Sequence, residues 1–159
     1  MLDQNFPWLA FRLPWPPSIN IVPLARINPH LISGVEDWEV LRALGRHGGV
    51  HGFITNDADF LNLGPEAAAI FDSKFALVTT TGVGHDALRA TGLLMVHLPG
   101  IRASLDGTPR VHELRPSGRR VHLARDVVSR AAQREGITAA ALLRKARREA
   151  RRPSDKSDS

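Results

Sequence analysis

Two aspartates, Asp57 and Asp59, follow a short apolar segment at 53–54 and precede a return to apolar residues at Phe60. This pattern predicts a strand that ends in a polar turn, with both carboxylates at the carboxyl end of the strand. In open α/β sheets, ligands bind at that edge. Two carboxylates on one turn can converge on a cation, although aspartate is also common in turns because it bonds its own backbone.

Two further aspartates stand where a parallel sheet would bring them to the same edge. Asp37 begins a helical pattern, and Asp3 follows the first apolar residues of the chain. Taken singly, Asp37 could be a first-turn acid that complements the helix dipole, and Asp3 could end a strand in a simple turn. Taken together, the acids suit a hard divalent ion such as Mg²⁺ or Mn²⁺, which prefers carboxylate oxygens and offsets their repulsion. The predicted metal ligands are Asp3, Asp37, Asp57 and Asp59.

The elements that position these acids can be read from apolar patterns. Short segments bounded by Gly, Pro, Asn or Asp predict strands at 19–24, 52–54, 76–80 and 93–98. Helical patterns lie at 37–46, 65–72 and 85–90. Strands that alternate with helices predict a mainly parallel sheet. Residues 100–118 predict a loop or hairpin, and two helical stretches follow at 125–135 and 138–152.

Charge divides the chain into an acidic body and a basic end. Residues 1–109 hold seven Lys/Arg and ten Asp/Glu, whereas residues 110–159 hold fourteen and six. We expect a body at 1–99, a loop or hairpin linker at 100–118, a basic helical extension at 119–152 and a polar disordered tail at 153–159. A basic end favours a polyanion partner, although a solvated arginine-rich helix face explains it as well. The candidate nucleic-acid contacts are Arg144, Lys145, Arg147 and Arg148.

Several classes of protein are excluded by composition. The chain has no cysteine, so a disulfide scaffold, a thiolate zinc site and a cysteine nucleophile are ruled out. Its seven histidines contain no H-E-x-x-H motif, so a zinc site of that type is not expected. No apolar run reaches the roughly 18 residues that a membrane span needs, and the start does not read as a signal peptide. We therefore expect a cytoplasmic protein with no membrane partner.

Three segments resemble the PIN-like family, which includes the VapC-type toxin ribonucleases. They are LDQNFP at 2–7, DWEVLRALG at 37–45 and ITNDADFLNL at 54–63. The resemblance covers about residues 1–99. It implies a three-layer α/β/α sandwich with a mainly parallel central sheet, and an acidic site that binds Mg²⁺ or Mn²⁺ and cleaves RNA.

The family's acids match the four aspartates above, and its T-x-D-x-D-F motif also matches Thr55 and Phe60. Asn56 stands where the family commonly has a basic residue. Asp86 is a candidate further acid near the same edge, although a first-turn acid of a helix explains it better. The second tier of candidate site residues is Asn5, Glu36, Thr55, Asn56 and Asp86.

The leading hypothesis is a Mg²⁺- or Mn²⁺-dependent endoribonuclease of the VapC type that hydrolyses phosphodiester bonds with metal-activated water. RNA is the expected substrate, and a cognate antitoxin protein and a second copy of the chain are candidate partners. The alternative is a catalytically inactive PIN-like module that binds nucleic acid or protein. In that case the basic end, which weakly resembles a ribbon-helix-helix unit, would bind DNA; otherwise these helices would pack on the body.

Overall fold

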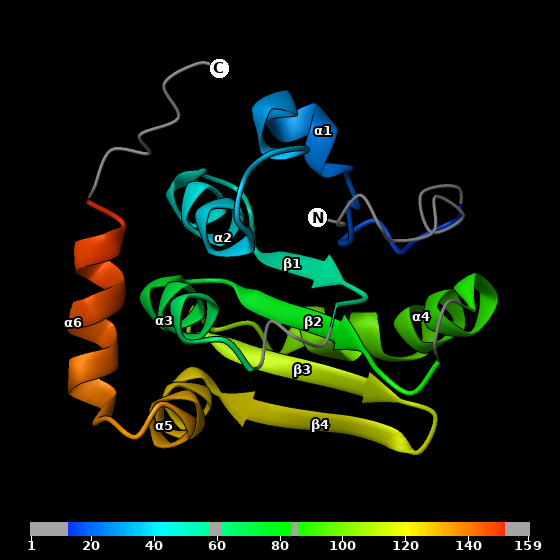
Figure 1. Cartoon of the computed structure of the whole chain (residues 1–159). Helices are drawn as coiled ribbons and strands as arrows, with labels where there is room; N and C mark the ends of the chain where they lie inside the picture. Colours follow the sequence, from blue (N-terminus) through cyan, green and yellow to red (C-terminus); the bar gives the residue numbers. More distant parts are fainter. Residues whose placement is uncertain (1–12, 58–61, 84–85, 152–159) are drawn as a thin grey trace.

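The computed structural model describes residues 13–57, 62–83 and 86–151 (Figure 1). Within these ranges the chain is an α/β protein with a four-stranded, mostly parallel open sheet and six α-helices. The strands are β1 (Gly52–Thr55), β2 (Ala76–Thr80), β3 (Arg110–Arg115) and β4 (Gly118–Leu123). The helices are α1 (Leu24–Ile27), α2 (Asp37–Arg46), α3 (Gly64–Asp72), α4 (Ala87–Ala103), α5 (Ala124–Arg134) and α6 (Ala139–Glu149), with a short 3-10 helix, η2 (Pro29–Leu31).

The sheet order is β1-β2-β3-β4. The first three strands are parallel, and β4 returns antiparallel to β3 through a tight hairpin. Gly118 closes that hairpin at a φ of 126°, a conformation that glycine adopts at no steric cost. The carboxyl ends of β1, β2 and β3 therefore share one edge of the sheet, toward which their arrows point in Figure 1.

Helices cover both faces of the sheet because strand residues alternate between them. Phe53, Leu77 and Val111 point to one face and form a core with α2, α3 and α5. Ile54, Val78 and Leu114 point to the other face and pack on buried residues of α4. The last helix, α6, packs against α3 and α5 and adds Leu142 to the first core.

Most of the expected elements are confirmed. The strands predicted at 52–54 and 76–80 are β1 and β2, and the helix predicted at 37–46 is α2. The helices expected at 65–72, 125–135 and 138–152 are α3, α5 and α6, shifted by no more than a few residues. Residues 100–118 contain the end of α4, a loop and β3, and β4 begins at Gly118.

Two predicted strands are wrong. Residues 93–98 lie inside α4, where Ala90, Leu94, Leu98 and Ile101 form one buried helical stripe. Short apolar runs fit either a strand or a buried helix, and here the helical spacing decides. Residues 19–24 do not join the sheet; Ile19 and Ile21 instead pack directly against the core on the α4 side. In the part of the chain that the structure describes, no helix is long and apolar enough to cross a membrane.

Candidate functional site

The turn that carries Asp57 is fixed to the neighbouring strand by two threonines. The Thr79 hydroxyl donates a hydrogen bond to the backbone carbonyl of Asp57 over 3.2 Å, and the Thr80 hydroxyl donates to the side-chain oxygen of Asn56. The Asp57 N–H donates to the hydroxyl of Thr55 over 3.0 Å. Thr55 and Thr79 are fully buried. The structure thus places Asn56 and Asp57 at the carboxyl edge, as the apolar pattern of β1 predicted.

Glu66 is a candidate site residue that was not predicted from the sequence. It lies in the first turn of α3 with only 5% of its surface exposed, and its Oε2 has no hydrogen-bond partner among the described residues. Burial raises the pKa of this carboxyl, and the negative charges of Asp37, Glu36 and Asp57 raise it further. A buried carboxyl therefore lies within interacting distance of three other acids, from the start of α2 and the end of β1.

The start of α2 brings Glu36 and Asp37 to this group. Both residues are exposed, and α2 packs beside α3, so the first turns of the two helices contribute acids to one region. The Glu36 N–H donates to the Glu39 carboxylate over 3.1 Å, which stabilises the first turn of α2. Glu39 therefore has a local capping role, whereas the charges of Asp37 and Glu36 act on Glu66.

The remaining predicted acids divide into two groups. Asp3, Asp59 and Asn5 lie outside the described residues. Asp86 caps the start of α4, where its carboxylate accepts a hydrogen bond from the Arg89 N–H over 3.0 Å and lies 3.3 Å from the Arg89 side chain. That is the first-turn role weighed for Asp86 from the sequence. Among the described residues there is no set of three or more His, Asp or Glu side chains already arranged to hold a metal ion.

A second buried carboxylate, Glu113, lies farther along the same edge of the sheet. It accepts hydrogen bonds from the Thr81 hydroxyl over 3.0 Å, from Arg115 Nη2 over 2.5 Å and from His122 Nε2 over 3.4 Å. Burial acts to raise the pKa of Glu113, but the hydrogen bonds from Arg115, Thr81 and His122 outweigh it and lower that pKa. Glu113 is therefore an ionised anchor that orients the Arg115 guanidinium.

The four basic residues expected to contact nucleic acid do not behave alike. Arg147 is paired with Asp72 of α3 at 2.6 and 3.0 Å, and Lys145 is paired with Glu135 at 2.8 Å. Arg144 and Arg148 are exposed on α6. Two of the four cations thus stabilise the packing of α6, and the contact with nucleic acid stays a prediction for all four.

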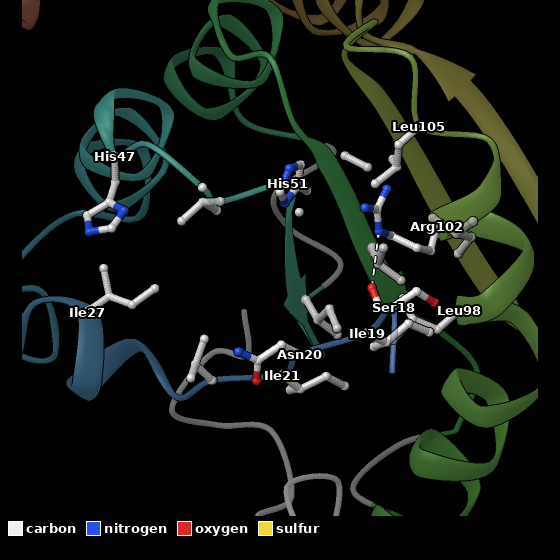
Figure 2. Close-up of a pocket in the computed structure, with 18 of the residues that line it drawn as sticks. Ser18, Ile19, Asn20, Ile21, Ile27, His47, His51, Leu98, Arg102 and Leu105 are labelled. Carbon is white, nitrogen blue, oxygen red and sulfur yellow. Dashed lines mark hydrogen bonds between the residues drawn. The ribbon is translucent and has the colours of Figure 1, made fainter. Parts of the chain in front are cut away.

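A cavity of about 480 Å³ lies on the α4 side of the sheet, away from these acids (Figure 2). Ile54, Val78 and Leu98 contribute to its apolar lining, and His51 and Arg102 are among its polar residues. The Arg102 Nε donates to the backbone carbonyl of Ser18 over 3.3 Å, which connects α4 to the segment before α1. None of the described residues that line this cavity is acidic, so it does not offer the carboxylate chemistry expected from the sequence.

The chain matches no protein-family model, no curated protein and no solved structure. The proposed function therefore depends on the residues of the acidic edge.

Proposed function

We propose that this chain is a Mg²⁺- or Mn²⁺-dependent endoribonuclease of the PIN-like, VapC type, with the α/β/α sandwich of that family. The observation that carries the proposal is the position of Glu66. A carboxyl that is 95% buried and lies close to Asp37, Glu36 and Asp57 is unfavourable without a positive charge nearby. A bound divalent cation removes that penalty.

The chemistry of these side chains suits such an ion, although the described carboxylates are not already arranged around one point. Asp37, Asp57 and Glu66 would bind it through water or after a side-chain movement, and the resemblance adds Asp3 and Asp59 as further ligands. Oxygen donors alone suit Mg²⁺ or Mn²⁺ rather than a softer metal. When bound, the ion supplies the positive charge that activates water and offsets the charge that develops at phosphorus.

The chain's own residues position this chemistry. Thr79 and Thr55 fix the turn of Asp57 from a buried part of the sheet, so the carboxylate starts from a rigid support. Glu66 approaches from the start of α3, where the helix dipole favours a negative charge. Because they come from a strand end and two helix starts, the acids can surround one ion from different sides.

Cleavage of RNA tests the proposal. Purified protein with Mn²⁺ should cut a mixed-sequence single-stranded RNA, EDTA should stop the reaction, and Asp57→Asn should reduce the rate at least a hundredfold. Asp126→Asn is the matched control, because Asp126 is an exposed acid on α5 and its loss removes the same charge. Equal rates for wild-type protein and Asp57→Asn would overturn the proposal.

The second candidate function is an inactive nucleic-acid-binding module. The exposed arginines of α5 and α6 favour it, because a cationic surface binds phosphates without any metal chemistry. In the described structure β4 is paired with β3, and α5 and α6 pack on α3, rather than forming a separate ribbon-helix-helix unit. Such a module would bind nucleic acid but would gain no thermal stability from Mn²⁺.

A further inference from the structure

One row of neighbouring residues crosses the sheet near its carboxyl edge and joins the acids to a basic end. The strand register pairs Thr55 with Thr79, Thr79 with Glu113, and Glu113 with Arg120. Paired residues point to the same face of a sheet, so all four share the face on which α2 and α3 lie. The hydrogen bond from His122 to Glu113 agrees with this orientation.

The two ends of the row carry opposite charges. The β1 end adjoins Asp57, Glu66 and Asp37, whereas the other end holds Arg115 and Arg120. Strands lie about 4.8 Å apart, so Glu113 is roughly 10 Å from Thr55 and Arg120 is roughly 14 Å from it. Arg115 and Arg120 are therefore separated from the acids along the sheet and are close enough to touch the same extended ligand.

The Arg115 guanidinium is oriented by Glu113 before any anion binds. Its Nη2 is bound to Glu113 at 2.5 Å, and Glu113 is itself fixed by Thr81 and His122. About 37% of the Arg115 side chain stays exposed, and its Nε is buried without a hydrogen-bond partner among the described residues. A planar guanidinium with an oriented fork of N–H groups suits the two oxygens of a phosphodiester. Arg120 pairs with Glu113, two residues from Arg115; it is exposed and adds a second cation.

We propose that Arg115 and Arg120 bind the phosphodiester backbone of an extended single-stranded RNA, next to the phosphate held at the acidic edge. This inference rests on the proposed nuclease function, and it names the residues that position the RNA strand beside the acidic edge. Backbone contacts of this kind position the strand without reading its sequence. The basic helix α6 is then not the main surface for the substrate.

Binding measured without catalysis tests the proposal. A fluorescently labelled single-stranded oligoribonucleotide is titrated with protein in EDTA and followed by anisotropy. We expect Arg115→Gln and Arg120→Gln each to weaken binding about tenfold at low salt. Each loss of a phosphate contact should also reduce the slope of log affinity against log salt by about 0.7.

Arg46→Gln on α2 is the matched control, because it removes one exposed positive charge of the same kind at the opposite end of that helix from Asp37. The proposal is overturned if both edge variants bind as the wild type does, or if Arg46→Gln loses as much affinity as they do. Arg120 is exposed, so its variant keeps the test valid even if Arg115→Gln fails to fold. If these variants weaken binding but Asp57→Asn leaves cleavage unchanged, the nuclease proposal fails and the RNA contact stands.

Discussion

Thr79 donates its hydroxyl hydrogen to the backbone carbonyl of Asp57, 3.2 Å away, so β2 holds the turn that carries the central acid of β1. The donor is fully buried, and its neighbour Thr80 donates to Asn56 on the same turn. The position of Asp57 thus depends on a strand 22 residues farther along the chain. A small displacement of this turn would move the carboxylate away from its partners.

Replacing Thr79 with valine should therefore affect activity more than stability. Thr79→Val keeps the shape of the side chain and removes only the hydroxyl, which should cost about 1 kcal/mol of unfolding free energy. We expect a tenfold or larger fall in RNA cleavage, because misplaced catalytic groups lose rate steeply. Thr91→Val is the control: Thr91 is also buried, and its hydroxyl donates to Ala87 within α4, away from the acids. Equal activity in the two variants would contradict the role given to Thr79.

Glu66→Gln should have opposite effects with and without metal. In EDTA the variant should melt roughly 2–4 °C higher, which corresponds to about 1 kcal/mol, because it removes a buried charge whose pKa is raised by burial and neighbouring acids. In Mn²⁺ it should gain less stability than the wild type, because a ligand is lost. Glu39→Gln should instead lower the melting temperature slightly in both conditions, because it removes a negative charge from the first turn of α2 while the glutamine can still accept the hydrogen bond from Glu36. A Glu66→Gln variant with an unchanged Mn²⁺ response would show that Glu66 does not meet the ion.

His112 should make the protein sensitive to mild acid. It is 98% buried, both ring nitrogens lack hydrogen-bond partners among the described residues, and burial together with Arg119 and Arg110 lowers its pKa from 6.5 to about 4. The folded state therefore holds a neutral ring. Above pH 6.5 the ring is neutral in both the folded and the unfolded state, so it costs no stability. As the pH falls from 6.5 toward 4, the unfolded state binds a proton that the folded state does not, and the unfolding free energy decreases.

The decrease in unfolding free energy caused by His112 should reach about 3 kcal/mol, since one pKa unit corresponds to about 1.4 kcal/mol. Denaturant unfolding of the wild type and His112→Leu between pH 7.5 and pH 4 measures it. The variant should lose less unfolding free energy over this range, and the difference between the two curves isolates His112 from the carboxylates. Parallel curves would show that the ring is not held neutral.

Gly64 should accept a side chain only if Leu142 and Glu135 move, because α3 begins in close contact with the C-terminal helices. A Cβ at this position would lie 2.7 Å from the Leu142 side chain of α6 and closer still to the Glu135 carboxylate. We expect Gly64→Ala to lower the unfolding free energy by about 1–3 kcal/mol. Gly92→Ala is the matched control in α4, where a Cβ meets nothing within 4 Å, and it should raise stability by up to about 1 kcal/mol. Thermal unfolding of both variants checks the prediction, and a neutral Gly64→Ala would contradict the packing of α6 on α3.

The sequence was most informative where the structure is local. Asp37–Arg46 has a clear helical stripe, and the apolar segment before Asn56 is short and bounded by turn residues, so α2 and β1 could be predicted from their own residues. The run at 93–98 was misleading because a strand and a buried helix bear the same apolar residues. Only the spacing of Ala90, Leu94 and Ile101 over a longer stretch identifies the helix.

The site could be predicted only in part, because its decisive contacts join distant residues. Glu66 shares a helical face with buried Ile70 four residues later, which was a usable signal of burial. A first-turn acid is also common on an exposed helix, so the position of Glu66 alone did not predict its burial. Glu113 and Thr81 are 32 residues apart, and nothing in either segment indicates that they meet. Only the strand register shows that Glu113 and Arg120 lie in one row with Thr55 and Thr79, beside Asp57.

Anomalous scattering from crystals soaked in Mn²⁺ would show whether the acids at the carboxyl edge bind a divalent ion. We expect one strong peak about 2.1 Å from carboxylate oxygens of Asp57, Asp37 or Glu66, and its disappearance in crystals of Glu66→Gln with Asp57→Asn. Ordered side chains at this edge with no peak between them, or a peak bound only elsewhere on the protein, would contradict this expectation.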